Sequence, residues 1–176
     1  MKEILSQLRS ANTKFGIRHI AIFPIKLPAN KIDLYKWIIE MQHSDYISYS
    51  TSHLAMGSFL KDGIFHAINV ENIGNETIVQ HYEMKYHTPN HVQLYSHKTS
   101  AYVLRWFPAT VGVPWEMKIK PVSESTSELI CLIGADFPSR FLKIAAWCNG
   151  LGGYFLKRHL NEEGKAFAED IERKFK

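Results

Sequence analysis

The alternation of apolar and polar residues predicts a strand and then a short helix near the start of the chain. Arg18–Leu27 is rich in branched side chains and ends before Pro28, which is typical of a strand. A helical pattern follows over Asn30–Gln42, with Asn30 as the expected N-cap and Asp33 placed as in a capping box. The side chains that we expect this helix to bury are Leu34, Trp37, Ile38 and Met41. The Ser- and Tyr-rich stretch 43–53 is expected to be a connection.

The clearest hairpin lies in the middle of the chain. Ile64–Ile73 and Glu76–Tyr86 are separated by Gly74-Asn75, a two-residue sequence that favours a tight turn between antiparallel strands. With that turn, Glu83 lies opposite His66.

The two faces of this hairpin differ in chemistry. One face carries ionisable groups among aliphatic residues: Ile64, His66, Ile68, Val70, Val79, His81 and Glu83. The other face is aromatic and aliphatic: Phe65, Ala67, Ile78, Tyr82 and Met84. Both faces are partly apolar, so periodicity leaves open which one is interior. The first face suits a pocket wall, and a half-exposed surface is the alternative.

The rest of the pattern predicts further strands and a long final helix. His91–Phe107 supplies one strand or two, Val113–Pro121 alternates cleanly, and Glu128–Phe137 is the last strand. A helix then runs from about Ser139 to Lys174, with a bend near the glycines at 150, 152 and 153. Its apolar stripe comprises Phe141, Ile144, Cys148, Leu151, Phe155, Leu160, Gly164, Phe167 and Ile171.

Composition limits the classes of function. The chain has 176 residues, enough for one domain spanning residues 1–176 with a sizeable core. Its net charge of +4 is not gathered into a basic stripe, which argues against nucleic-acid binding. No apolar stretch is long enough to span a membrane. The N-terminus lacks a signal-peptide core and instead predicts an amphipathic helix that buries Ile4, Leu5, Leu8, Ala11 and Phe15. Cys131 and Cys148 match no metal or redox spacing, so we expect reduced core cysteines in a cytoplasmic protein.

This order of elements resembles the helix-grip superfamily of START-like and polyketide cyclase domains. The resemblance implies an α+β fold in which a curved antiparallel β-sheet wraps around a long C-terminal α-helix and leaves an internal cavity. It also implies a small aromatic or apolar ligand as partner. We expect no nucleic acid and no membrane as partners, and we keep a homodimer as an open possibility.

Two motifs suggest a metal site. His159 and Glu163 are four residues apart on the final helix, so they project from the same face and can close on a single ion. With residues 46–53, which read Tyr-Ile-Ser-Tyr-Ser-Thr-Ser-His, they resemble two motifs of the diacetylphloroglucinol hydrolase and phloretin hydrolase family. The resemblance implies a zinc enzyme that cleaves a carbon–carbon bond between an acyl group and a phenolic ring. Residue by residue, the resemblance implies the zinc ligands His53, Glu83, His159 and Glu163.

The remaining roles are less narrowly defined by the sequence. Tyr46, His66 and His81 are the candidates to supply or relay a proton. A one-residue change of hairpin register would send Glu83 to the other face, and Glu71 or His66 would then replace it. Two other functions stay open: metal-free binding, transport or sensing of a hydrophobic ligand, and a polyketide cyclase or aromatase. Each ligand candidate also has an ordinary structural role, as a loop, strand or helix surface residue.

Overall fold

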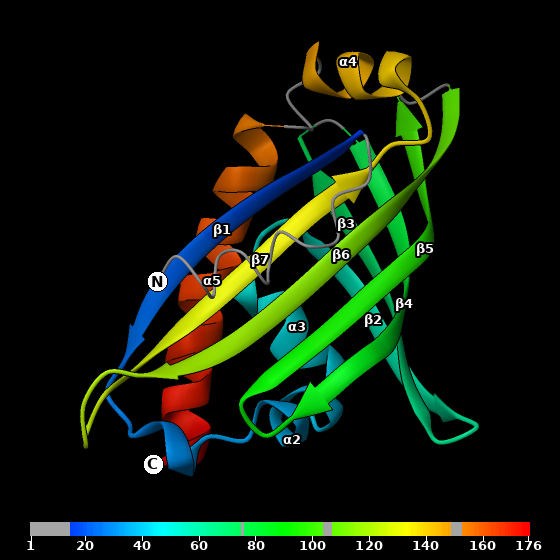
Figure 1. Cartoon of the computed structure of the whole chain (residues 1–176). Coiled ribbons are helices and arrows are strands. Elements are labelled where there is room, and N and C mark those ends of the chain that lie inside the picture. The colour runs from blue at the N-terminus through cyan, green and yellow to red at the C-terminus, as the bar shows by residue number, and fades with distance from the viewer. Residues whose placement is uncertain (1–14, 75, 104–106, 149–152) are drawn as a thin grey trace.

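A computed structural model describes residues 15–74, 76–103, 107–148 and 153–176 (Figure 1). Seven antiparallel strands form one sheet in the order β1-β7-β6-β5-β4-β3-β2. The strands are β1 (Gly16–Ile25), β2 (His53–Lys61), β3 (Ile64–Ile73), β4 (Glu76–Thr88), β5 (His91–Val103), β6 (Phe107–Pro121) and β7 (Ser127–Asp136). The first and last strands of the chain are therefore neighbours, and β2 and β3 lie at the opposite edge of the sheet.

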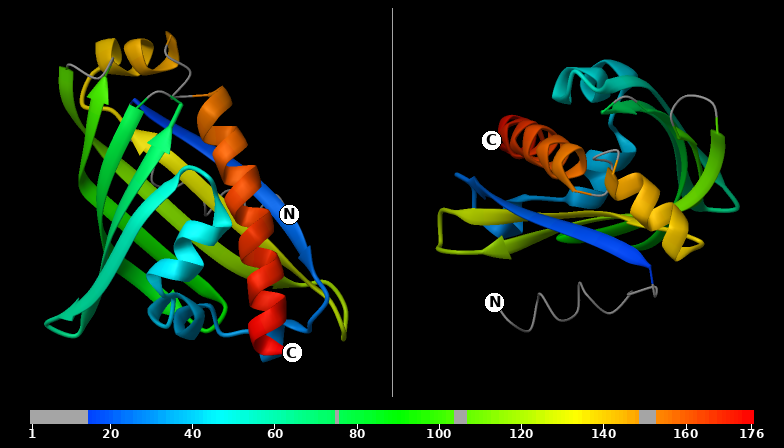
Figure 2. Two further views of the ribbon diagram at one scale, coloured as in Figure 1. Left: turned by 180° about the vertical axis from the view of Figure 1, so that it is seen from behind. Right: turned by 90° about the horizontal axis from the view of Figure 1, so that it is seen from above.

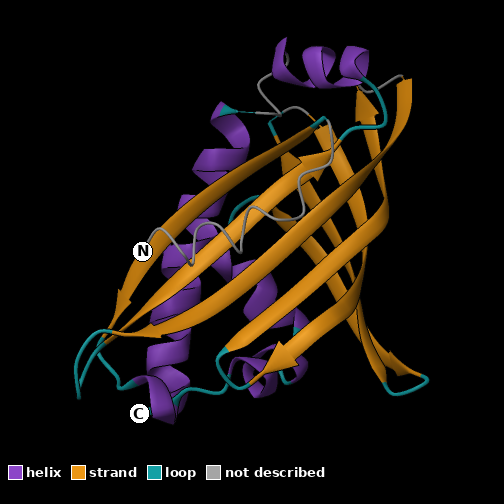
Figure 3. Cartoon of the chain, viewed as in Figure 1, coloured by secondary structure: helices purple, strands orange, loops and turns teal. Residues whose placement is uncertain are grey.

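The helices gather on one side of the sheet. They are the short η1 (Ala29–Lys31), α2 (Leu34–Ile39), α3 (His43–Tyr49), α4 (Arg140–Cys148) and α5 (Tyr154–Phe175). Figure 2 shows the sheet curving around α5, with α2 and α3 on the same side and α4 at one end of the strands. The separation of helices and strands is also visible in Figure 3. The predicted α+β arrangement of a curved antiparallel sheet around a C-terminal helix is confirmed.

The predicted hairpin is confirmed in register and in its turn, and β4 continues two residues past the predicted end at Tyr86, to Thr88. Strand β3 pairs with β4 so that His66 faces Glu83 and Ile68 faces His81. Gly74 has a φ of 66°, a backbone conformation that glycine adopts without steric cost. The structure also decides between the two faces, because Phe65, Ala67, Tyr82 and Met84 are buried in the core.

The segment between β1 and β2 differs in detail from the prediction. The first helix begins after Asp33, whose carboxylate accepts a hydrogen bond from the Lys36 backbone amide, so Asp33 rather than Asn30 is the N-cap of α2. Residues 43–49, expected to be a connection, form α3 instead. Its first turn is closed by a capping box between Gln42 and Asp45, which supplies the helix start that the Ser- and Tyr-rich composition obscured.

The C-terminal segment is two helices rather than the single one predicted. Helix α4 ends at Cys148 and α5 begins at Tyr154, with residues 149–152 outside the described part. The side chain of Phe141 is 77% exposed and Cys148 is also exposed, so the first half of the expected stripe does not pack on the sheet. Leu142 and Ala146 lie on the inner side of α4 instead.

The second half of the stripe is confirmed. Leu160, Phe167 and Ile171 are buried, and an added Cβ at Gly164 would collide with the ring of Phe23 on β1. Gly164 therefore permits the close approach of α5 to the sheet. The expected N-terminal amphipathic helix falls within residues 1–14 and lies outside the described residues. Among the helices that the structure describes, none has the length and apolar character needed to cross a membrane.

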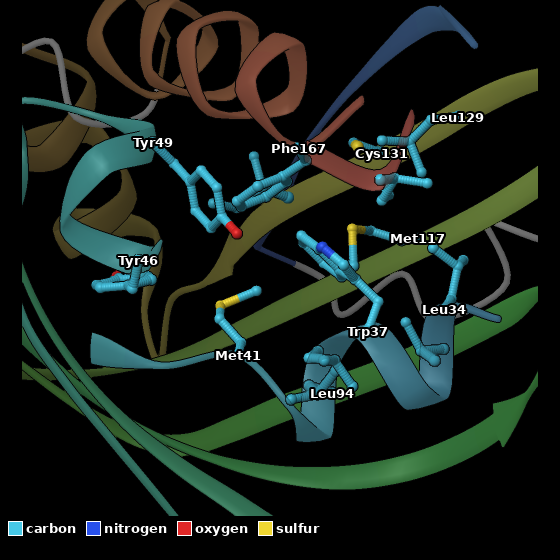
Figure 4. Packing of buried hydrophobic residues seen from close by; sticks show 14 of the residues in the cluster. Leu34, Trp37, Met41, Tyr46, Tyr49, Leu94, Met117, Leu129, Cys131 and Phe167 are labelled. Atoms are coloured by element: carbon cyan, nitrogen blue, oxygen red, sulfur yellow. The ribbon is translucent and has the colours of Figure 1, made fainter. Parts of the chain in front are cut away.

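An aromatic cluster joins α2, α3 and α5 (Figure 4). The ring of Phe167 makes edge contacts with Trp37 and Tyr49, at centroid distances of 5.2 and 5.0 Å. Asp170, one helical turn after Phe167, accepts hydrogen bonds of 2.8 Å from both Trp37 Nε1 and the Tyr49 hydroxyl. One buried carboxylate thus ties both short helices to α5.

Replacing Asp170 by Ala should lower the free energy of unfolding by at least about 2 kcal/mol, because two buried donors lose their acceptor. Burial raises the pKa of Asp170, but the hydrogen bonds from Trp37, Tyr49 and Lys174 lower it overall. A carboxylate with a lowered pKa stabilises the fold above its ordinary pKa, and this contribution is lost as pH falls. Urea unfolding should therefore show a smaller difference between wild type and variant at pH 3 than at pH 7.

Glu169→Ala is the matched control, because Glu169 is exposed on the same helix and only approaches Lys165 at 3.9 Å. It should cost less than about 1 kcal/mol. Equal losses for the two variants would contradict the role assigned to Asp170.

Candidate metal centre

Two strands and one helix bring four ionisable side chains together inside the fold. His53 is the first residue of β2 and pairs with Glu71 on β3, so the register of the sheet edge places them side by side. His159 and Glu163 lie one turn apart on α5 and face these strands. All four residues are buried, with 3–5% of their surface exposed.

The distances between their donor atoms are short. Glu163 Oε2 lies 3.3 Å from His53 Nε2 and 3.2 Å from His159 Nε2. Glu71 lies 3.5 Å from His159 Nε2 through Oε2 and 4.0 Å from His53 Nε2 through Oε1. These separations are close to the edge of a tetrahedron of ligands around zinc, about 3.3–3.5 Å for bonds of about 2.0–2.2 Å.

Hydrogen bonds to the outer atoms fix the orientation of both imidazoles. His53 Nδ1 lies 2.7 Å from the carbonyl oxygen of Tyr46, which can only accept, so the Nδ1–H is the donor and Nε2 faces the cluster. Ser50 Oγ donates to Glu162 and lies 3.5 Å from His159 Nδ1, so it is an acceptor for that ring. A histidine that ligates a metal typically donates its other N–H to an oxygen in this way.

Glu71 is held by two further side chains. The Tyr46 hydroxyl donates to Glu71 Oε1, and the Tyr46 ring stacks on the His53 ring at a centroid distance of 3.9 Å. Gln80 Nε2 donates to Glu71 Oε2 over 3.4 Å. Burial and the charge of Glu71 strongly raise the pKa of Tyr46, so its hydroxyl stays protonated and remains a donor.

The charges of the cluster reinforce one another. Burial lowers the pKa of His159, but Glu163 and Glu71 outweigh it and raise the pKa to about 11. The pKa of His53 is raised by the same carboxylates against the effect of burial. Burial raises the pKa of Glu163, but His159 and His53 lower it to about 2. Without a metal the cluster is therefore a set of buried ion pairs.

The donor set nevertheless fits a divalent cation. One donor atom each from His53, Glu71 and His159 lies within 4.8 Å of the other two. Although His159 Nε2 is only 3.2 Å from Glu163, it makes no hydrogen bond of acceptable geometry within the described residues, and neither does Glu163 Oε1. Buried polar atoms are almost always hydrogen-bonded, so two that lack a well-directed hydrogen bond and converge with a second imidazole indicate a place for a cation.

The structure does not bring three of the predicted site residues to this cluster. Glu83, His66 and His81 project from the outer face of the hairpin, where the Glu83 side chain is 34% exposed and pairs with Lys85 at 2.7 Å. The register is as expected, but the aromatic face is the inner one, because turning Phe65 and Tyr82 outward would expose much larger apolar surfaces. Glu71 supplies the carboxylate that we expected from Glu83.

Three residues of the predicted site are found together, and Tyr46 lies beside them. His53, His159 and Glu163 meet as the two motifs suggested. The sequence did carry a signal for the missing partners. Glu71 and Gln80 are two of the four polar residues, with Asn69 and Glu76, on the otherwise apolar face of the hairpin, and a carboxylate and an amide on a buried face need a polar partner there.

Cavities surround the cluster. A pocket of about 20 Å³ is lined by Tyr46, Glu71, Tyr82, Trp115 and Glu163, together with apolar neighbours. A more polar pocket of about 190 Å³ reaches the other side of the cluster, where its lining includes Asn72, Arg158, His159 and Glu162. The four ionisable groups thus lie between an apolar interior and a polar approach.

Comparison with known proteins identifies the fold but not a sequence family. No protein family matches the sequence, and neither does any curated protein. Among solved structures, the Zhui aromatase/cyclase from Streptomyces sp. R1128 aligns with a TM-score of 0.66 at 7% identity, over 92% of this chain and 96% of that one. A START superfamily protein from Mycobacterium smegmatis aligns with a TM-score of 0.52 at 12% identity, over 88% and 99%.

The chain has the START-like helix-grip fold. The di-domain ARO/CYC protein BexL from the BE-7585A biosynthetic pathway matches it as well, with a TM-score of 0.58 at 8% identity, over 99% of this chain and 59% of that one. Identities this low carry the fold alone. The narrower resemblance to the acylphloroglucinol-type hydrolases finds no support in these comparisons.

Glu71→Gln should reduce zinc affinity at least tenfold, because it removes a charged ligand while keeping the volume of the side chain. Glu83→Gln is the matched control and should leave the affinity unchanged, since Glu83 lies on the outer face. Zinc content after purification without chelator, followed by competition with a chromophoric chelator, measures both. Loss of zinc in the Glu83 variant alone would overturn the assignment.

Proposed function

We propose that this protein is a zinc-dependent enzyme that acts on a small, ring-bearing carbonyl compound held between the sheet and α5. The observation that carries the proposal is the buried convergence of His53, Glu71, His159 and Glu163 beside an apolar interior. A cluster of this kind is costly to bury for stability alone, and perturbed ionisable groups in a cavity are typical of functional sites.

Zinc bound by these four residues would polarise a carbonyl and lower the pKa of water towards about 7. The chain's own residues supply the rest. Tyr46 positions Glu71 through its hydroxyl and also lines the small pocket, where it is the candidate proton donor. Trp115, Tyr82 and Phe167 are aromatic walls of the same small pocket, which at about 20 Å³ has room for a small group beside the cluster.

The reaction that we propose is hydrolysis of the bond between an acyl group and a phenolic ring, as in acylphloroglucinol-like compounds. A carbon leaving group of this kind must be protonated as the bond breaks, and Tyr46 is the candidate donor because its hydroxyl lies beside the cluster; the carboxylic acid that is formed then returns a proton to Tyr46.

A second function has its own support. Two of the three structures compared above are aromatase/cyclase proteins, which favours a cyclase or aromatase, or a metal-free carrier of a hydrophobic ligand, built on the same cavity. Dependence on zinc separates these functions from the hydrolase, because neither of them requires the four-residue cluster to hold a cation.

Zinc-loaded protein should release a carboxylic acid from at least one member of a panel of acylated phloroglucinols, phloretin-like ketones and aryl esters. His159→Ala should abolish both zinc retention and turnover. Tyr46→Phe should keep the zinc and lower kcat about 10²-fold or more, because it removes a proton donor. Tyr86→Phe is the control for this change, since Tyr86 is exposed on β4 and should behave as wild type.

Acid release can be followed by chromatography and zinc content by elemental analysis. No acid from any compound, together with binding of an apolar ligand by zinc-free protein, would contradict the hydrolase and favour the carrier or cyclase.

A further inference from the structure

A second apolar cavity, larger than the pocket of about 20 Å³ beside the cluster, lies next to the candidate metal centre. Its volume is about 70 Å³, and its walls come from strands β3 to β7, from the inner side of α4 and from Leu156 of α5. By the measure in which one water needs about 10–15 Å³, this is room for about five waters, comparable with a single six-membered ring and one substituent. Gln80 and Thr99 are the polar side chains among the described lining residues.

Gln80 is buried with an unused acceptor. The residue is 1% exposed, and its Oε1 has no hydrogen-bond partner among the described residues. Gln80 Nε2 donates to Glu71 Oε2 over 3.4 Å, which leaves Oε1 as the atom without a partner. The free atom of Gln80 is thus the carbonyl oxygen, so the missing partner is a donor.

Thr99 does not offer an equivalent site. Its hydroxyl donates to Ser96 Oγ over 2.8 Å. Ser96 Oγ also accepts a hydrogen bond from the His81 backbone amide. The Thr99 oxygen therefore already takes part in a hydrogen bond, whereas Gln80 Oε1 has none among the described residues. The other described side chains that line the cavity are apolar, which makes an unpaired carbonyl at Gln80 costly until a donor binds.

We propose that this cavity binds the ring of a phenol whose hydroxyl donates a hydrogen bond to Gln80 Oε1. The inference rests on the proposed function, because it assigns a binding site to the phenolic ring of that substrate class. Gln80 bridges the two parts of the site, since its Nε2 holds Glu71 and its Oε1 receives the ring hydroxyl. Gln80 then selects for a hydroxylated ring over an apolar ring of the same size.

The test compares p-cresol with p-xylene, which differ by a hydroxyl in place of a methyl group. Binding of each is measured by calorimetry or ligand-observed NMR to wild type, Gln80→Met and Thr99→Val, all zinc-loaded. The quantity of interest is the ratio of the two dissociation constants within one protein, because it cancels general effects of a substitution on the cavity. Gln80→Met should shift that ratio at least tenfold in favour of p-xylene, the equivalent of 1.4 kcal/mol.

Thr99→Val should leave the ratio within about twofold of wild type, because the Thr99 oxygen already takes part in a hydrogen bond to Ser96, whereas Gln80 Oε1 has no partner among the described residues. An unchanged ratio in Gln80→Met, with both compounds still bound, would overturn the role of Gln80 and leave the proposed function standing. A shift in Thr99→Val instead would assign the acceptor to Thr99 and overturn it as well. If wild type binds neither compound, the ring site proposed for this cavity is refuted, while release of a carboxylic acid by wild type tests the proposed function separately.

Gln80→Met also removes the amide that holds Glu71, so zinc content is measured on the same samples. His159→Ala, which should lose zinc but leave Gln80 in place, should retain the wild-type preference for p-cresol. Loss of that preference in His159→Ala would show that the metal, not Gln80, recognises the hydroxyl.

Discussion

The structure depends on the burial of two carboxylates and two imidazoles in one place. Glu71 and Glu163 would repel each other in an apolar interior if no positive charge lay between them, and His53 and His159 would lose much of their hydration. Placed together at 3.2–4.0 Å, the four groups balance one another. This balance requires that the edge strands and α5 hold a fixed relative position, and much of the surrounding packing serves that requirement.

Two features outside the cluster provide this fixed position. Asp170 anchors α2 and α3 to α5 two turns beyond Glu163, while Gly164 lets the same helix approach β1 closely. Helix α3 carries Tyr46, whose carbonyl, ring and hydroxyl all contact His53 or Glu71. The core contacts of one helix therefore determine the orientation of the polar groups, so packing and chemistry in this protein are not separable.

The sequence predicted those parts of the fold that local pattern controls. The turn at Gly74 and the alternation on either side of it were enough for the register of β3 and β4. The helical spacing of His159 and Glu163 was likewise enough to place them on one face. What the pattern could not decide was which face of the hairpin turns inward, because both faces are partly apolar and the choice depends on what packs against them.

That undecided choice explains the error at Glu83. Family spacing favoured Glu83, yet the burial of Phe65 and Tyr82 turns it outward and brings Glu71 to the cluster without any change of register. The break between α4 and α5 escaped prediction for a related reason. The apolar stripe continues through the break, but Phe141 at its start is exposed. Apolar periodicity thus identified one face of the helix without showing whether the sheet packs against it.

Charge balance also bears on how the cluster would take up the proposed cation. The raised pKa values of His53 and His159 stabilise the metal-free fold fully below their ordinary value of 6.5, and this contribution is lost as pH rises towards the folded value, about 11 for His159. The lowered pKa of Glu163 contributes above 4.5 and is lost as pH falls towards about 2. Where both contributions are present, the protonated imidazoles offset the charge of Glu163. A divalent cation would displace protons from the imidazoles when it binds, so rising pH favours the cation. The same four residues can therefore stabilise the empty fold and still yield their protons to a metal.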